Sequence, residues 1–434
     1  MPRSTKRYLA ATVVVALGTM LAACSSSGSD ADSVELEIWN PETDDASVAA
    51  FQSMIDEYEE SHPNTEIKLV NIPWADIFTK WQAALQSGNA PDATIGSAAF
   101  AASFQAQGVL EPLDDVVETI GGDDVWADSA SSLVSMSQDD DGYFALPYVN
   151  NAVVLWYNKA MLAEEGLEPP TNWEELKTAA AKMTHDDQYG LLVPSSTSQV
   201  TSQSLYSVIL SNGGDLVDRQ NPGTVTFDDP KSVEAIDFYS SLAQYAPPGA
   251  GGYDRPEAQA AMTTGKLGMF IYGSWMQSAL EAAGPEVTAQ FGAVPVPAND
   301  ESGGGTFMGG LSLFSFKGSE HPEETKDFLA SMLTSKSYED YVLINPSQSI
   351  PVLTSVQESE SYLSSDRVTA QNELIGVVKE SLPNSWFFGL PNPHAGEWEG
   401  LNLVAKAATA VVDNGKDAKS AATEVADEMR DSLK

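Results

Sequence analysis

Residues 145–154 read ALPYVNNAVV, and this stretch decides how we expect the chain to be organised. Pro147 interrupts an apolar run, and Asn150 and Asn151 then precede a second apolar run, AVVLWYN (residues 152–158), that reads as a strand. Two strands separated only by such a break indicate a place where the chain crosses between parts of the molecule, rather than the interior of one element.

Two further stretches have the character of a crossing. Residues 301–314, ESGGGTFMGGLSLF, form a glycine-rich entry into a strand, and residues 344–353, INPSQSIPVL, are a weaker example. Three crossings in a chain of 434 residues suit two lobes joined by several strands.

Around these crossings, short apolar runs alternate with amphipathic stretches. VELEIW (residues 34–39), TEIKLVNIP (65–73) and DATIGSA (92–98) read as strands. Between them, Phe51, Met54, Ile55 and Tyr58 share one helical face, and residues 74–88 predict a second helix that Gly88 stops. This order predicts a parallel sheet with helices on its faces.

The later part of the chain repeats this alternation. We expect strands at YGLLVPS (residues 189–195), KLGMFIYGSW (266–275) and FGAVPVP (291–297), and a helical tail over residues 401–434. Two helix starts carry capping signals: Thr171 with Glu174 forms a capping box, and Asp229 precedes Pro230.

The beginning of the chain has the pattern of an export signal. Arg3, Lys6 and Arg7 precede residues 8–23, which hold no charged side chain and are fewer than the roughly 20 residues of a membrane-spanning helix. Residues 21–24, LAAC, resemble the lipobox of bacterial lipoproteins, in which the cysteine receives a diacylglyceryl group and the chain is cut before it. An ordinary signal peptide with a chance cysteine is the alternative.

Cys24 is the only cysteine, so no internal disulfide can form. The segment that follows it, SSSGSDADS (residues 25–33), is a flexible coil with a reach of roughly 15–18 Å. We therefore expect a signal peptide over residues 1–23, a lipidated cysteine with its tether over residues 24–33, and anchoring on the outer face of the cell membrane. Two acyl chains are what stable anchoring requires.

The amino-acid composition argues against some classes of binding partner. The chain carries 62 Asp and Glu against 22 Lys and Arg, a net charge of −40. Nucleic acids and phosphate-rich ligands are poor candidates, because affinity for them comes from basic side chains. The acidity favours solubility, and attraction of a cationic ligand is the alternative.

Motifs for catalysis are missing from the sequence. The four histidines are scattered and form no metal-ligand spacing, there is no G-x-S-x-G elbow or P-loop, and GGGTFMGG departs from the dinucleotide fingerprint at Met308. A glycosidase carboxylate pair cannot be recognised among so many acids. We expect no catalytic residue, no metal and no cofactor.

Aromatic residues stand at the ends of predicted strands and in the loops that follow. In open α/β sheets these positions face a ligand cleft. An indole suits the apolar face of a sugar ring, and asparagines and carboxylates can bond its hydroxyl groups. Core packing is the alternative for each single tryptophan. The candidates are Trp39, Trp74, Tyr148, Trp275 and Trp386, with Asn40, Asn150 and Asn151.

In this order and spacing, several segments resemble the family 1 extracellular solute-binding proteins of bacterial ABC importers, the maltose-binding-protein-like class that serves carbohydrates. The segments are SGNAPDATIG, FAASFQAQGVLEPLDD, DGYFALPYVNNAVVLWYNKAML, PPTNWEELKTAAAKMT, NGGDLVD, FDDPKSVEAIDFY, GKLGMFIYGSW and HPEETKDFLASMLTS. The resemblance implies an α/β, two-lobed periplasmic-binding-protein-like fold of the class II type, in which each lobe is a mixed sheet flanked by helices and a multi-strand hinge joins the lobes.

The resemblance also implies domain bounds and ligand contacts. Residues 34–150 with 311–347 form lobe 1, residues 151–310 with 348–434 form lobe 2, and the crossings lie at 148–153, 309–313 and 345–351. Where maltose-binding relatives have an Asp-Arg pair, this chain has Ala99 and Phe100, which leaves the sugar open. The full expected ligand-binding set is Trp39, Asn40, Glu42, Trp74, Ser97, Tyr148, Asn150, Asn151, Trp275, Gly309, Trp386 and Trp398.

The expected function is capture of a mono- or oligosaccharide between the lobes and its delivery to an ABC transporter permease by a monomeric, lipid-anchored protein. The alternatives are a lipid-anchored carbohydrate-active enzyme, a surface adhesion or sensor protein, and a binding protein for a cationic solute that is not a sugar.

Overall fold

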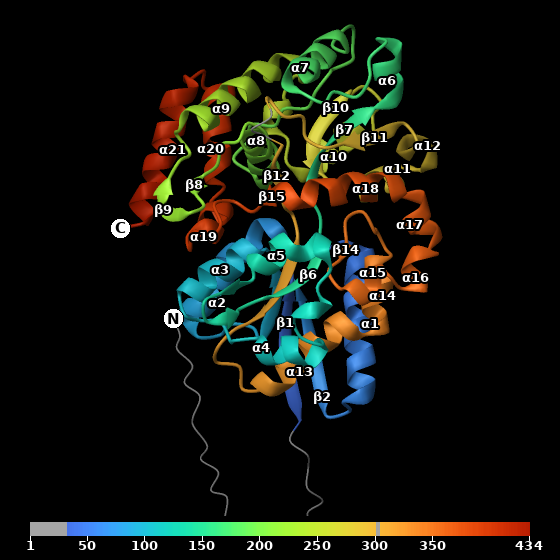
Figure 1. Cartoon of the computed structure of the whole chain (residues 1–434), viewed down its shortest axis with the longest axis vertical. Helices are drawn as coiled ribbons and strands as arrows, with labels where there is room; N and C mark the ends of the chain where they lie inside the picture. The colour runs from blue at the N-terminus through green and yellow to red at the C-terminus, as the bar shows by residue number, and fades with distance from the viewer. Residues whose placement is uncertain (1–32, 301–303) are drawn as a thin grey trace, which may run out of the picture.

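The chain forms two lobes that lie one above the other in Figure 1. The structure is a computed structural model and describes residues 33–300 and 304–434. The lower lobe holds the N-terminal strands and helices and the orange segments after residue 310, and the upper lobe holds the green, yellow and red segments. No helix in the described ranges is long and apolar enough to span a membrane. Cys24 and the expected signal peptide and tether lie outside these ranges, except for Ser33.

A mixed six-stranded sheet forms the centre of the lower lobe. Its strand order is β14-β6-β13-β3-β1-β2. β1 runs parallel to β2 and to β3, whereas β13 and β14 run antiparallel to their neighbours. The strands are β1 (Val34–Asn40), β2 (Thr65–Asn71), β3 (Ala93–Gly96), β6 (Leu146–Asn150), β13 (Leu311–Ser315) and β14 (Ile350–Pro351).

Helices cover both faces of this sheet because successive strand residues point to opposite sides. Ile38 packs in the core cluster with the buried face of α1, whereas Trp39, the next residue, packs in a second cluster with α2 and α3. The helices of this lobe are α1 (Asp45–Ser61), α2 (Trp74–Ser87), α3 (Ala98–Ala106), α4 (Asp114–Ile120), α5 (Ser131–Ser135), α13 (Pro322–Thr334), α14 (Lys336–Val342), α15 (Thr354–Gln357) and α16 (Glu360–Leu363).

The predicted strand and helix order of this lobe is confirmed. Gly88 ends α2 in the left-handed region at φ 71°, where its NH bonds to carbonyl groups of the last turn, as the stop signal in the sequence indicates.

The upper lobe contains a small antiparallel sheet and a larger share of helix. The sheet order is β10-β7-β11, with β7 (Val153–Asn158), β10 (Met269–Gly273) and β11 (Phe291–Val294). The helix α8 (Gln199–Ser211) is buried from residue 200 to its end. The other helices are α6 (Lys159–Glu164), α7 (Trp173–Lys182), α9 (Pro230–Leu242), α10 (Arg255–Met262), α11 (Met276–Ala283), α12 (Pro285–Thr288), α17 (Asp366–Ala370), α18 (Asn372–Ser381), α19 (Ala395–Gly400), α20 (Leu403–Ala408) and α21 (Ala418–Ser432).

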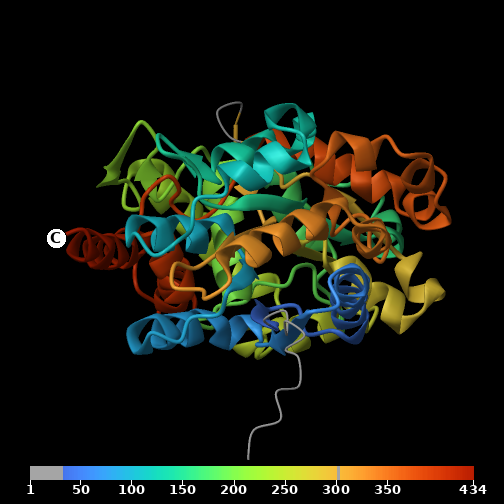
Figure 2. The same ribbon diagram turned by 90° about the horizontal axis from the view of Figure 1, so that it is seen from below.

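Short strand pairs complete the description. β4 (Gln138–Asp139) pairs with β5 (Gly142–Tyr143), β8 (Val217–Asp218) with β9 (Asn221–Val225), and β12 (Thr306–Phe307) with β15 (Ser385–Trp386). The helical tail is confirmed, and Figures 1 and 2 both place its last helix, α21, at the outer edge of the molecule.

Two local predictions differ from the structure. The predicted strand at residues 189–195 makes only single bridges to Leu267 and Phe270, and Pro194 has no NH to continue the pairing. The cap of α7 is shifted by one residue: Asn172 accepts the NH of Glu175, whose carboxylate accepts from Thr171.

The chain passes between the lobes where the sequence breaks. β6 lies in the six-stranded sheet and β7 in the upper one, and a bridge between Ala152 and Met308 joins the two neighbouring crossings. The expected domain bounds remain predictions, but one detail of them differs. Ile350 pairs with Asn150, so the lower sheet extends beyond residue 347.

The lower lobe allows a test of its core. Trp81 is 0% exposed, its Nε1 donates to Thr94 Oγ1 at 3.2 Å, and its ring contacts Phe100, Phe104 and Phe314. Trp81→Ala should lower the free energy of unfolding by about 3–5 kcal/mol in urea denaturation, because the cavity left behind cannot collapse fully. Leu401 is 47% exposed. Leu401→Ala should change the same quantity by about 0.5 kcal/mol or less, and equal effects of the two variants would contradict this account.

Candidate functional site

A cleft between the two lobes contains a cavity lined by residues of both. The space between atoms there is about 580 Å³, a figure that includes open solvent. Its walls come from both lobes and from the crossings: Glu42, Trp74, Ser97, Val149, Asn151, Gln199, Gln203, Arg255, Trp275, Phe307, Gly309, Gly310, Leu311, Tyr341, Gln348, Ser349, Phe387 and Glu399.

Half of the expected ligand-binding residues line this cavity. Glu42 follows β1, Trp74 begins the helix after β2, and Ser97 follows β3, so all three lie at the carboxyl ends of parallel strands. This edge is where open α/β sheets bind their ligands. The crossings and the upper lobe bring Asn151, Gly309 and Trp275 to the same space.

Four of the expected aromatic residues do not line the cavity. Trp39 packs in the core and donates to Glu37, and Tyr148, a residue of strand β6, is fully buried in the core. Trp386 lies under the Arg219 guanidinium, 3.9 Å from the ring centroid. Trp398 is 1% exposed and packs inside the upper lobe. Strand position alone does not say which face of the sheet a side chain occupies, and this is why the prediction included Trp39, Tyr148 and Trp386. Trp398, which lies in α19, was implied by the resemblance.

Two of the expected asparagines organise backbone instead of lining the cavity. Asn40 is fully buried, and its side chain accepts from the NH of Glu42 at 3.0 Å and donates to the carbonyl of the same residue at 2.7 Å. It thereby holds the loop that presents Glu42. Asn150 donates to the Ser129 carbonyl at 3.0 Å and accepts the NH of Asn151.

The most prominent residues that the sequence prediction missed are charged. Arg255 begins α10, directly after the cap residue Asp254, and the capping box formed with Glu257 was a usable signal for a helix starting here. Glu399 is the residue after Trp398. The resemblance implied Trp398, and not Glu399, as a ligand contact. The uncharged polar residues missed are Gln199, Gln203, Tyr341, Gln348 and Ser349.

Glu42 and Arg255, which come from opposite lobes, attract each other electrostatically in the cleft. Burial raises the pKa of Glu42, while the charge of Arg255 and the NH of Trp74, at 2.8 Å, oppose this rise. Burial lowers the pKa of Arg255, but Tyr272, Glu42 and Asp254 outweigh it and the pKa of Arg255 is raised. Arg255 therefore stays protonated.

Glu399 is the second acid in the cavity. It is 4% exposed, and the Ser97 hydroxyl donates to its Oε2 at 2.8 Å. Burial raises the pKa of Glu399 to about 7, with the Ser97 hydrogen bond opposing the rise. Near neutral pH this carboxyl is divided between its acid and carboxylate forms.

Two buried polar atoms of the lining have no hydrogen-bond partner. They are the acceptor Asn151 Oδ1 and the donor Trp275 Nε1. Buried polar atoms without partners are rare in proteins and require an explanation. A ligand hydroxyl group both donates and accepts, and it is therefore the kind of group that can satisfy either atom.

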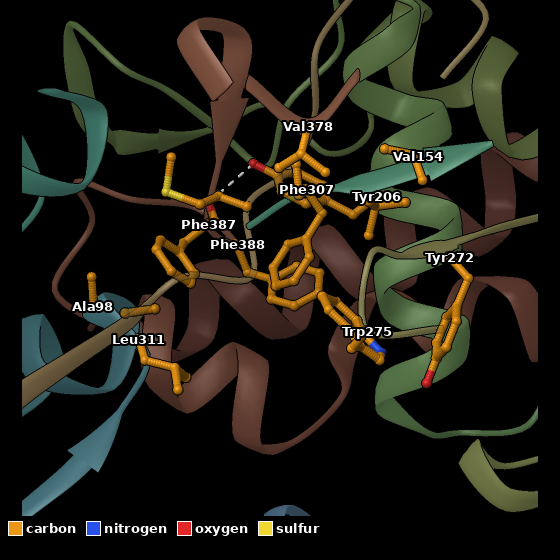
Figure 3. Packing of buried hydrophobic residues seen from close by; sticks show 14 of the residues in the cluster. Ala98, Val154, Tyr206, Tyr272, Trp275, Phe307, Leu311, Val378, Phe387 and Phe388 are labelled. Atoms are coloured by element: carbon orange, nitrogen blue, oxygen red, sulfur yellow. Dashed lines mark hydrogen bonds between the residues drawn. The ribbon is translucent and has the colours of Figure 1, made fainter. Parts of the chain in front are cut away.

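Aromatic side chains give the cavity its apolar wall. Figure 3 shows Trp275, Phe307 and Phe387 gathered with Leu311 where the ribbons of the two lobes meet. Trp275 is 8% exposed and packs edge-on against Tyr272, and the Arg255 guanidinium lies 5.9 Å from its ring centroid.

No group of acidic, histidine or cysteine side chains in the described residues could hold a metal ion. A cavity with aromatic walls, amides, hydroxyls and a few charges can hold a small polar molecule by stacking and hydrogen bonds.

Comparison with known proteins finds a matching protein family and relatives of similar sequence. The family model for bacterial extracellular solute-binding proteins matches residues 43–339. A protein of Escherichia coli K12, YcjN, which carries the name of an ABC transporter periplasmic-binding protein, is 24% identical over 82% of this chain and 82% of its own length.

Solved structures agree with the fold. A solute-binding protein of an ABC transporter from Thermotoga lettingae, bound to α-D-tagatose, has a TM-score of 0.79 at 21% identity, covering 93% of this chain and 100% of its own. The GacH receptor of Streptomyces glaucescens, solved unliganded and with acarbose, has a TM-score of 0.77 at 25% identity, covering 92% and 98%. The predicted two-lobed α/β fold is confirmed, and so is the prediction of a binding protein rather than an enzyme.

The cavity wall at Gly309 leaves no room for a side chain. A Cβ there would lie 2.3 Å from Asn151 Oδ1 and 2.6 Å from Trp275 Cζ3. Gly309→Ala should therefore lower the free energy of thermal unfolding by about 1–3 kcal/mol, the usual cost of overpacking. Gly376 lies in α18 with no atom within 4 Å of its would-be Cβ. Gly376→Ala should instead add up to about 1 kcal/mol, and a Gly309→Ala protein as stable as the unchanged one would refute the close packing.

Proposed function

Since the chain belongs to the family of bacterial extracellular solute-binding proteins, we propose that it captures a sugar in its cleft and delivers it to an ABC transporter permease. The ligand is a mono- or oligosaccharide. The observation that carries this proposal is the pairing of an apolar aromatic wall with the two unpartnered polar atoms, Asn151 Oδ1 and Trp275 Nε1.

A sugar ring matches both properties of the cavity. Its C–H face can lie against an aromatic ring, and its hydroxyl groups can bond the amides, hydroxyls and carboxylates of the walls. Similar proteins support this class of ligand, since the neighbours from Thermotoga lettingae and Streptomyces glaucescens hold tagatose and acarbose.

Walls from both lobes suit a closing mechanism. A ligand that contacts Trp74 and Ser97 below and Trp275 and Gln203 above makes all its contacts only when the lobes are together. Such a ligand shifts the population toward the closed form. A permease can then distinguish a loaded protein from an empty one by its shape.

The alternatives have less support. The relatives are named as binding proteins rather than enzymes or adhesins. A cationic solute would meet Arg255, which stays protonated, as well as the acids Glu42 and Glu399. Neither the relatives nor the cavity favours a cation over a neutral polyol.

We extend the proposal to the beginning of the chain. Residues 1–23 would be removed on export, Cys24 would carry the lipid, and residues 25–33 would tether a monomeric body to the outer face of the membrane beside its permease. The support is the sequence pattern LAAC and the uncharged segment before it.

A thermal-shift screen of mono- and oligosaccharides tests the ligand class. A ligand present at 100 times its dissociation constant adds about 2.7 kcal/mol of stability. We expect at least one sugar to raise the melting temperature, with amino acids and polyamines as comparison sets. A shift with polyamines alone would replace the sugar by a cationic solute.

The sugar found in this way allows a test of the aromatic wall. Trp275→Ala should weaken its binding roughly thirtyfold or more in calorimetric titration, because removing a stacking indole costs about 2 kcal/mol. Trp275→Phe should keep part of the affinity. Trp386→Ala, outside the cavity, is the matched control and should keep near-native affinity. If Trp275→Ala only lowers the melting temperature of the ligand-free protein, Trp275 is a core residue.

The anchor is tested separately. Cys24→Ser should move the protein from the membrane fraction to the culture fluid without changing ligand affinity, because the described residues that line the cavity all lie outside residues 24–33. Membrane retention of the variant would disprove lipidation at Cys24, whatever the ligand.

A further inference from the structure

One short helix, α19, packs against other elements of the upper lobe. Trp398 in its middle is 1% exposed, and its Nε1 donates to Ser432 Oγ of α21 at 2.9 Å. Asn392, just before the helix, donates to the Pro222 carbonyl at 2.6 Å. We call residues 392–400 the α19 clamp. These contacts tie the clamp to α21 and to β9 of the upper lobe.

The opposite side of the α19 clamp rests on the lower lobe. Ser103 of α3 donates to the Pro393 carbonyl at 2.6 Å and accepts the NH of Gly396 at 2.9 Å. A Cβ at Gly396 would lie 2.6 Å from the Ala99 carbonyl oxygen, so the two backbones are in direct contact. Figure 1 shows α19 between α3 below and α20 above. Separation of the lobes requires this contact to break.

Glu399 lies within the contact and projects toward the lower lobe. Its partner Ser97 caps α3, accepting the NH of Phe100, and both residues also line the ligand cavity. Among the described residues, no neighbouring charge acts on the pKa of Glu399, which responds only to burial and to the Ser97 hydrogen bond. A carboxylate buried without a cation is unfavourable, because its charge loses its hydration.

Several titratable side chains belong to the elements and the cavity wall next to Glu399. On α19 itself, His394 and Glu397 pair with each other at 3.0 Å, and α3 has no titratable side chain. The others are Asp76 and Lys80 on α2, Lys406 on α20, and Glu42, Arg255 and Tyr341 around the cavity. None of them sets the pKa of Glu399, which follows from burial and Ser97 alone.

We propose that the α19 clamp is a proton-dependent lock on the cleft: neutral Glu399 keeps α19 docked on α3, and ionisation of Glu399 releases it and lets the lobes open. The lock acts in the ligand-free protein and does not depend on which solute the cleft binds. Closure of the lobes then depends on the contact between α19 and α3 as well as on the hinge.

The direction of the pH effect and the pH range in which it occurs follow from the difference in the pKa of Glu399 between the docked and open forms. The pKa of Glu399 is about 7 with the lobes docked and returns toward 4.5 when opening exposes the group to water. The docked form thus binds the proton more tightly, and docking weakens as pH rises from 4.5 to 7 and levels off above. Between pH 5.5 and 8.0 the ratio of closed to open protein should fall about 30-fold.

The distance between two spin labels tests the lock. Thr79 on α2 and Ala260 on α10 are exposed residues of opposite lobes, and Cys24 is the only native thiol. The ligand-free full chain with Cys24→Ser, Thr79→Cys and Ala260→Cys is labelled and measured by pulsed electron resonance at pH 5.5 and 8.0. We expect one short distance at pH 5.5 and a longer population at pH 8.0.

Two further variants separate the lock from other causes. Glu399→Gln keeps the shape but cannot ionise, so the short distance should persist at pH 8.0. Glu397→Gln, on the same helix, removes the partner of His394 and should leave the pH response unchanged. A pH-independent distance in the parent chain, or an unchanged pH response in Glu399→Gln, would overturn the proposal. Both results are independent of the sugar screen.

Discussion

The cleft depends on the direct contact between two segments that carry the chain from one lobe to the other. The NH of Gly309 donates to the Asn151 carbonyl at 3.1 Å, and a Cβ at Gly310 would lie 2.9 Å from Asn150 Oδ1. Larger residues would hold these segments apart. Because the segments are bonded backbone to backbone, the lobes can move relative to each other only through a few torsions next to them, and the same contact brings Asn151 and Gly309 into the cavity.

Adjacent asparagines at this crossing have opposite roles. Asn150 satisfies both ends of its amide within the protein, through Ser129 and the NH of Asn151. Asn151 donates to the Gln348 carbonyl, but its Oδ1 remains unpartnered in a buried site. An unsatisfied buried acceptor costs about 1–3 kcal/mol. This unpartnered acceptor belongs to the crossing and also lines the cavity, where a bound hydroxyl group could satisfy it.

The sequence predicted the architecture well because strands and helices follow local patterns. Trp74 was expected near the cleft because it follows a predicted strand, whereas Glu42 and Ser97 were implied by the family resemblance, and all three line the cavity. The sequence could not tell inward from outward faces, which is why Trp39 and Tyr148 were included although they pack in the core. The upper-lobe wall, with Gln199, Gln203 and Arg255, comes from helices whose orientation only tertiary packing decides.

The charge of the cleft differs from that of the whole chain for a physical reason. A net charge of −40 describes exposed carboxylates, which stay hydrated and are screened by salt. In the cleft, burial raises the pKa of both Glu42 and Glu399, whereas Arg255 remains charged. The ionisation of the cleft groups is therefore governed by burial and by their neighbours rather than by the net charge of the surface. The acidity of the chain thus says little about its ligand.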